Sequence, residues 1–235
     1  MAPVRNYSSW NSRKEDTVEQ IEPYQKFFFI CEGANTETWY FRKLIDLKKS
    51  LGIHPLIDLC LLEKTDEDRN LSYPLQLIRF ANQQKEAQEL HFDKGHDKMI
   101  VVFDADIFEE KVGNYHEILR IAEESGDIVA VTNPSFELFL LLHYEGSYES
   151  DILPNQEKIL KNEKQGNSTF IYKLLLKKSG INSKKNSEIG NLAEKVEIAI
   201  CQEMNLNQDE RRCSGQITSN IGKIIEEIRN HTIKM

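Results

Sequence analysis

Short apolar runs along the chain predict four β-strands. The runs at residues 26–31 and 98–103 are rich in aromatic and β-branched residues, and each stops at a polar turn. That combination is typical of strands that are buried on both faces. Apolar residues alternate along residues 56–62, and a fourth run covers residues 128–131.

The segments between these runs show helical periodicity, with apolar residues recurring every three or four positions. Pro134 stands early in the fourth of these segments, where proline favours the start of a helix. The alternation of strands and helices predicts an α/β fold, with a mostly parallel, Rossmann-like sheet covered by helices on both faces. The expected helices span residues 36–50, 74–90, 115–124 and 133–144.

The pattern changes after Gly146. No strong strand is predicted there, so we expect a helical appendage to follow the α/β core. The helical candidates are residues 156–162, 169–178, 191–204 and 219–230. The expected division is a flexible N-terminal arm at 1–22, a catalytic core at 23–148 and the helical appendage at 149–235.

Composition indicates an ordinary soluble protein. The 235 residues are 40% hydrophobic and 29% charged, which is enough for one sizeable core. No apolar stretch approaches the roughly 18 residues that span a bilayer, and the first 20 residues lack the apolar centre of a signal peptide. Cys31, Cys60, Cys201 and Cys213 show no CxxC spacing. A cytoplasmic protein without membrane contact is therefore expected.

Positive charge is concentrated in one segment of an acidic chain. The net charge is −8, yet residues 158–185 hold eight lysines and one glutamate, which leaves about −15 for the rest. Such asymmetry favours contact with a phosphate backbone, although a lysine-rich surface that binds nothing has the same pattern. Lys173, Lys177 and Lys178 are the candidate nucleic-acid contacts.

Three acidic residues follow the two most apolar runs. Glu32 comes directly after the first, and Asp104 and Asp106 follow the run at 98–103. In open α/β sheets, ligands bind beyond the carboxyl ends of the strands, so all three carboxylates are expected at one edge. Clustered carboxylates repel each other unless a cation lies between them. The pattern therefore predicts a Mg²⁺ (or Mn²⁺) site suited to phosphoryl chemistry, with these three residues as ligands and catalytic groups.

Four further residues are candidates for supporting roles. Glu37 opens the first helix, where a carboxylate is also favoured by the helix dipole alone. Glu137 lies within an apolar helix, which is costly unless the side chain is paired or faces a site. Asn133 and His143 flank the same helix, and for His143 a structural role in the core is the simpler interpretation. Neither a GK[ST] phosphate loop nor a GxGxxG motif is present, so the chain shows no nucleotide-binding loop of its own.

Three motifs, in this order, resemble the RloB-like family. Residues 31–41 (CEGANTETWYF) resemble its CEGxxTExxYF signature, and residues 103–106 (FDAD) resemble its DxD motif. Residues 133–144 (NPSFELFLLLHY) resemble its NPxFExWLLLHF segment. Phe139 replaces a frequent Trp, and Ile107 replaces a frequent Asp after the DxD, which leaves one potential metal ligand fewer.

The resemblance implies a Toprim-type fold, with one Glu after the first strand and DxD after the third. It also implies a Mg²⁺-dependent nuclease centre, a role in anti-phage defence by abortive infection, and an AAA/ABC-type ATPase as partner. DNA and tRNA both remain open as substrates, and so does homo-oligomerisation. The rival interpretation is a non-catalytic partner subunit that binds the ATPase or nucleic acid through its basic segment.

Overall fold

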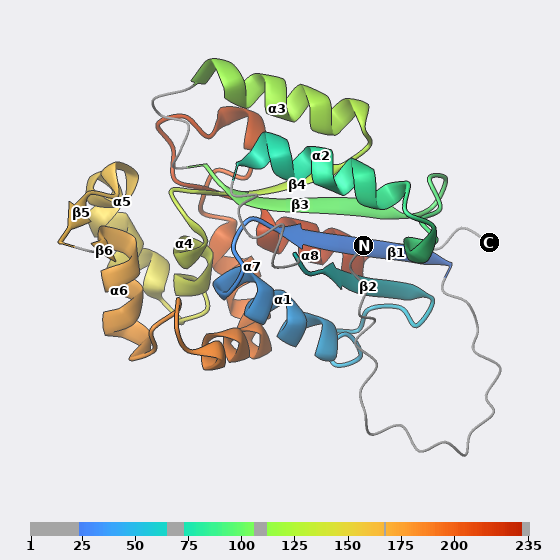
Figure 1. The fold of residues 1–235 in the computed structure, drawn as a ribbon. Helices are drawn as coiled ribbons and strands as arrows, with labels where there is room; N and C mark the ends of the chain where they lie inside the picture. Colours follow the sequence, from blue (N-terminus) through green and yellow to red (C-terminus); the bar gives the residue numbers. More distant parts are fainter. Residues whose placement is uncertain (1–23, 65–72, 106–111, 167, 232–235) are drawn as a thin grey trace.

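The computed structural model describes residues 24–64, 73–105, 112–166 and 168–231. It consists of one main sheet with helices packed on both of its faces (Figure 1). The expected N-terminal arm, residues 1–22, lies outside the described residues. The main-sheet strands are β1 (Gln25–Cys31), β2 (Ile57–Leu62), β3 (Lys98–Asp104), β4 (Ile128–Asn133) and β7 (Thr218–Ser219).

The strand order in the sheet is β2-β1-β3-β4-β7. The first four strands are parallel, and β7 runs antiparallel to β4. The order places β1 and β3 side by side in the middle, where Phe29 is in register with Ile100. The predicted α/β fold with a mostly parallel sheet is therefore confirmed. A second, two-stranded sheet pairs β5 (Lys164–Gln165) with β6 (Ser168–Thr169).

Helices follow the strands in alternation up to β4, and several more come after it. The α-helices are α1 (Thr36–Asp46), α2 (Pro74–Lys85), α3 (Val112–Glu124), α4 (Phe136–Leu141), α5 (Gln156–Lys161), α6 (Phe170–Ser179), α7 (Val196–Glu203) and α8 (Ile221–Arg229). The 3-10 helices are η1 (Gln88–Leu90), η4 (Leu153–Asn155), η5 (Ser187–Lys195) and η6 (Glu210–Arg212), and η3 (Tyr148–Ile152) is a π-helix.

Side-chain alternation along the central strands divides the core into two layers. In β1, Phe28 and Ile30 pack with α2 and α3, whereas Phe27 and Phe29 pack on the opposite face. That second layer also contains apolar residues of α1, α4, α6, α7 and α8. The helices from both ends of the chain therefore share one core with the sheet. The predicted boundary at residue 148 stays a prediction.

The parallel strands all point the same way, toward α4 and the helices α5 and α6 (Figure 1). The carboxyl ends of β1 and β3 therefore face the lysine-rich part of the chain. This arrangement brings residues from the two halves of the sequence to one edge of the sheet.

Three expectations about elements are wrong in detail. Pro134 is not in the first turn of a helix, because the Asn133–Pro134 peptide is cis and α4 begins at Phe136, with Ser135 as its N-cap. The expected helix at 191–204 is divided, since the 3-10 helix η5 precedes α7. Strands do occur after Gly146, but each has only two residues, too few for a periodic pattern.

None of the helices within the described residues is long and apolar enough to cross a membrane.

Candidate functional site

Glu32 and Asp104 meet at the carboxyl edge of the two central strands. The Glu32 amide donates a 2.8 Å hydrogen bond to the carbonyl of Val102, which extends the pairing of β1 with β3 by one residue. The Asp104 amide in turn donates to Oε2 of Glu32 at 3.2 Å. Thr132, in the neighbouring strand β4, donates to Oδ1 of Asp104 at 2.8 Å. The sheet itself therefore brings these two predicted carboxylates together.

Glu37 reaches the same place from the first turn of α1. Its carboxylate lies so close to Gly33 that a Cβ on that glycine would overlap it. The glycine after Glu32 therefore leaves room for a second acidic side chain. Desolvation, together with the negative charge of Glu137, raises the pKa of Glu37 to about 7, against an ordinary value of 4.5.

Glu137 is the fourth acidic residue and lies in the first turn of α4, with 6% of its surface exposed. The Ser135 hydroxyl donates to Oε2 of Glu137 at 2.7 Å, and the Ser183 hydroxyl lies 3.4 Å from Oε1. These two contacts supply hydrogen-bond partners for the acidic side chain of an otherwise apolar helix. They explain why the chain tolerates a glutamate inside this helix.

These four residues, Glu32, Glu37, Asp104 and Glu137, are called the carboxylate cluster below. Their mutual repulsion is felt most strongly at Asp104. Desolvation and the nearby charges of Glu37, Glu137 and Glu32 raise the pKa of Asp104 well above its ordinary value, while the Thr132 hydrogen bond opposes the shift. Excess negative charge of this kind favours the binding of a cation.

Two lysines act on the carboxylate cluster. The Nζ atom of Lys64, two residues beyond the end of β2, donates a 2.5 Å hydrogen bond to the carbonyl of Glu32. The positive charges of Lys64 and Lys184 both lower the pKa of Glu37, against the larger effect of desolvation. Within the described residues, two lysines thus place positive charge near the four acidic groups of the cluster.

Asn133 and His143, both predicted as supporting residues, make their contacts elsewhere. The Asn133 side chain donates to the carbonyls of Cys213 and Gln216, each at 2.8 Å. Fully buried His143 lies 3.0 Å from the hydroxyl of Tyr40, and its other ring nitrogen lies 3.0 Å from a backbone carbonyl of α4. Desolvation lowers the pKa of His143 to about 4, so the ring is neutral near pH 7. Both residues hold the core together.

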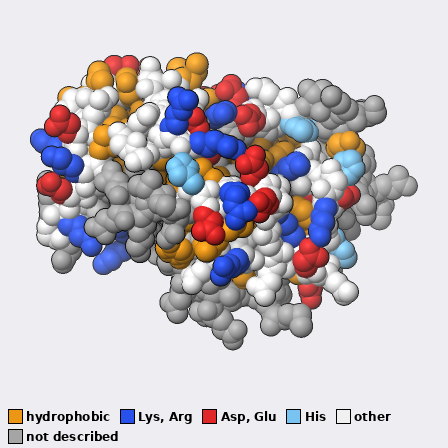
Figure 2. Space-filling view, turned by 90° about the horizontal axis from the view of Figure 1, so that it is seen from above, with side chains coloured by type: hydrophobic (Ala, Val, Ile, Leu, Met, Phe, Trp, Pro, Cys, Tyr) orange, Lys and Arg blue, Asp and Glu red, His pale blue; other side chains and the backbone are white. Residues whose placement is uncertain are grey.

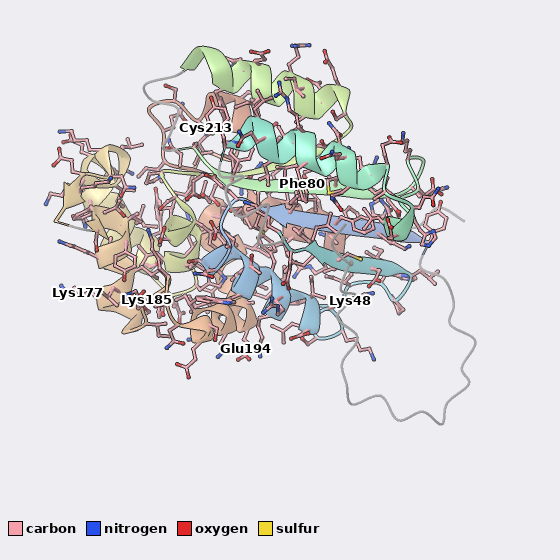
Figure 3. All side chains as sticks on the ribbon, viewed as in Figure 1. Lys48, Phe80, Lys177, Lys185, Glu194 and Cys213 are labelled. Atoms are coloured by element: carbon pink, nitrogen blue, oxygen red, sulfur yellow. The ribbon has the colours of Figure 1, made fainter. Side chains whose placement is uncertain are left out.

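The three candidate nucleic-acid lysines are exposed on α6. Lys177 points outward at the rim of the molecule (Figure 3). Lys178 is paired with Asp151 at 2.8 Å, which leaves Lys173 and Lys177 as the more available charges of the three. On the face that α2 and α3 cover, acidic and basic side chains are interspersed (Figure 2). Positive charge is therefore not gathered there.

Several residues of the site were missed by the sequence analysis. Lys64 follows β2 at the same sheet edge as the acids, so the rule that identified Glu32 could have identified it too. Thr132 is a polar residue in an apolar strand and carried a similar signal. Lys184 belongs to the basic segment at residues 158–185 but was not singled out within it. Ser183 carried no signal, because the segment between α6 and η5 has no periodic pattern.

The donor chemistry of the site fits a hard divalent cation. Carboxylate oxygens are the ligands that Mg²⁺ prefers, and the charges around Asp104 favour a cation there. Within residues 24–64, 73–105, 112–166 and 168–231, no three His, Cys, Asp or Glu side chains are placed to hold a metal ion together. The predicted third ligand, Asp106, lies outside the described residues.

Comparison with known proteins places the chain in a family. The model of the RloB-like protein family matches residues 27–228, which includes every residue of the carboxylate cluster, all of α6 and most of α8. Searches of curated proteins and of solved structures found no match. Because the family model covers most of the sequence, the chain belongs to the RloB-like protein family.

Proposed function

We propose that the chain is a Toprim-type, divalent-metal-dependent nuclease that cleaves phosphodiester bonds of DNA or tRNA as an effector of anti-phage defence. The observation that carries this proposal is the carboxylate cluster at the carboxyl edge of the parallel sheet. Neighbouring acidic groups contribute to the raised pKa values of Asp104 and Glu37, as expected at a site that binds a cation. Such a centre can hold the cation with which a metal-dependent nuclease polarises the phosphate.

Glu32, Asp104 and Asp106 would hold the Mg²⁺ or Mn²⁺ ion. When bound, the ion polarises the phosphate and stabilises the leaving oxygen. Thr132 keeps the Asp104 carboxylate oriented through its hydrogen bond to Oδ1. Lys64, bonded to the Glu32 carbonyl, fixes the turn in which Glu32 lies.

The proton of the attacking water needs an acceptor. Glu37 is suited to this task, because desolvation raises the pKa of its carboxylate above the ordinary value and makes it a better proton acceptor than a solvated carboxylate. Glu32 is the alternative base. Glu137, held by two serine hydroxyls, keeps negative charge next to Glu37 and so helps to maintain its raised pKa.

The test is a cleavage assay of the purified chain with plasmid DNA and total tRNA, in Mg²⁺, Mn²⁺ or EDTA. Metal-dependent cleavage is expected, and Asp104→Asn should abolish it. Asp46→Asn is the matched control, because Asp46 is exposed at the far end of α1 and should leave cleavage unchanged. Cleavage that persists in EDTA, or in the Asp104 variant, would contradict the proposal.

A second candidate function is that of a non-catalytic partner subunit of a defence ATPase. The finding that favours it is that, in the described parts of the chain, no three metal-binding side chains converge on one point. In that case, the exposed lysines of α6 would bind the ATPase or nucleic acid. Lack of cleavage with the cognate ATPase present, together with stable association in gel filtration, would support this alternative.

A further inference from the structure

The segment between α6 and η5 is fastened to the start of α1. The Thr36 hydroxyl donates a 2.9 Å hydrogen bond to the carbonyl of Ser183, and the side-chain amide of Asn35 donates to the carbonyl of Lys184 at 3.2 Å. The hydroxyl of Ser183 lies 3.4 Å from Glu137. Ser183 and Thr36 are both buried, so the two contacts of Ser183 are shielded from water, whereas the contact between Asn35 and Lys184 is exposed. The backbone at residues 183–184 is thereby fixed beside the carboxylate cluster.

The next element strengthens this attachment. The 3-10 helix η5 packs so closely on α1 that a Cβ at Gly190 would lie 2.5 Å from the backbone oxygen of Trp39. The segment at 183–184 is therefore bounded on its C-terminal side by an element in close contact with α1. It has little freedom to move away from Glu37 and Glu137.

The side chain of Lys184 is exposed, and its charge reaches the carboxylate cluster. The Nζ atom lies 5.6 Å from the centre of the Tyr172 ring, a cation–π arrangement that directs the flexible side chain. The same charge lowers the pKa of Glu37, although less than the charge of Lys64 does. The backbone of Lys184 is thus fixed by its hydrogen bond to Asn35, and the Tyr172 ring orients its side chain.

A polyanionic substrate needs positive charge beside this centre. The chain carries a net charge of −8, and four of its acidic groups lie in the cluster that a phosphate must approach. A bound divalent ion would compensate only the phosphate that is attacked, whereas its neighbours along the backbone also carry charge. A lysine with a fixed backbone next to the cluster meets that need.

We propose that Lys184 is a substrate-binding residue of this site, and that its ammonium group binds the backbone phosphate next to the one that is cleaved. This inference rests on the proposed nuclease function. It gives Lys184 a role different from that of the α6 lysines, which lie farther along the basic surface and supply affinity for any nucleic acid. It also makes residues 183–184, from the C-terminal part of the chain, a component of the active centre.

The test compares Lys184→Gln with Lys184→Arg and with a control, Lys49→Gln. Lys49 is exposed beyond the C-terminal end of α1, so its replacement makes the same charge change away from the cluster. Binding of labelled plasmid fragments and tRNA is measured in EDTA at several salt concentrations, and cleavage in Mg²⁺. Equal thermal unfolding midpoints verify that the variants are folded.

Lys184→Gln should weaken binding several-fold and lower the slope of log affinity against log salt by roughly one unit. KM should rise by more than kcat falls, and Lys184→Arg should restore most of the affinity. Wild-type cleavage with an unchanged slope and KM in Lys184→Gln would overturn the Lys184 proposal alone. Absence of both binding and cleavage in the wild type, with the ATPase partner present, would overturn the proposed function and this inference together.

Discussion

At the scale of single residues, Glu37 makes stability depend on pH. Its pKa is about 7 in the folded protein and close to 4.5 in the unfolded chain, so between these values the folded state binds the proton more tightly. The contribution of this group to metal-free stability is therefore greatest below pH 4.5 and is lost as pH rises to 7. Glu37→Gln should remove that dependence and raise stability at pH 8.

The measurement is urea unfolding in EDTA at pH 5, 6, 7 and 8. Glu89→Gln serves as the control, because Glu89 is an exposed acid away from the cluster. An identical pH dependence in wild type and Glu37→Gln would mean that Glu37 is not the titrating group.

Gly33 is predicted to control the position of the Glu37 carboxylate. A methyl group at residue 33 would overlap that carboxylate, which can move because it ends a flexible side chain. Gly33→Ala should therefore change stability by less than about 0.5 kcal/mol, as most tolerated surface substitutions do. It should nevertheless lower Mg²⁺ affinity in isothermal titration calorimetry. Unchanged affinity would place the metal away from Glu37.

All four residues of the carboxylate cluster were named as candidates from the sequence, two of them for a geometric reason. The carboxyl ends of parallel strands share one edge, so Glu32 and Asp104 had to meet once their strands were recognised. The partners of Glu137 were not predictable. Ser183 comes from a loop that is distant in sequence and lacks periodicity, and only tertiary packing brings it close.

At the scale of elements, the contact between η5 and α1 should be sensitive to a single methyl group. Gly190→Ala places a carbon against the Trp39 carbonyl, a backbone atom that cannot yield as a side chain can. We expect a loss of about 1–3 kcal/mol of unfolding free energy, the usual cost of overpacking. Denaturant unfolding measures it, with Ser187→Ala, at an exposed position of the same element, as the control. A loss below 0.5 kcal/mol would indicate that η5 can shift freely.

The prediction of elements succeeded where an apolar or periodic pattern extends over many residues. It failed where a short strand pairs with a segment that is far away in the sequence. The strands at 26–31 and 98–103 are continuous apolar runs, and the structure places β1 and β3 there. The strand β7 has two residues, and its pairing with β4 depends on contacts that no local pattern encodes. The helix expected from residue 133 begins only at Phe136, because Asn133 remains in β4 and Pro134 lies in the connection.

At the scale of the whole molecule, the lysine-rich segment at residues 158–185 should govern how nucleic-acid binding depends on salt concentration. Lys177 and Lys185 both lie at the end of the molecule that contains α6, whereas Lys48 lies below β2 toward the opposite end (Figure 3). Replacing Lys173, Lys177 and Lys178 with Gln should weaken nucleic-acid binding for all sequences and flatten its salt dependence. Most of the effect should come from Lys173 and Lys177, since Lys178 is paired with Asp151.

Fluorescence anisotropy over a series of salt concentrations measures this effect. The variant in which all three lysines are replaced retains the fold if its circular dichroism spectrum matches that of the wild type. Binding that stays intact while association with the ATPase is lost would identify α6 as a docking surface and favour the partner-subunit alternative.

The short strand β7 has a consequence for the order in which the chain is made. The outer edge of β4 is closed by β7 and by the Asn220 side chain, which accepts from the amide of Val131 and donates to the carbonyl of Val129. Asn220 is synthesised 91 residues after Val129, so on the ribosome this edge waits unpaired while α4 to α7 emerge. Unpaired strand edges invite pairing with other chains. The edge of β4 is therefore open to such pairing until β7 and Asn220 have been translated.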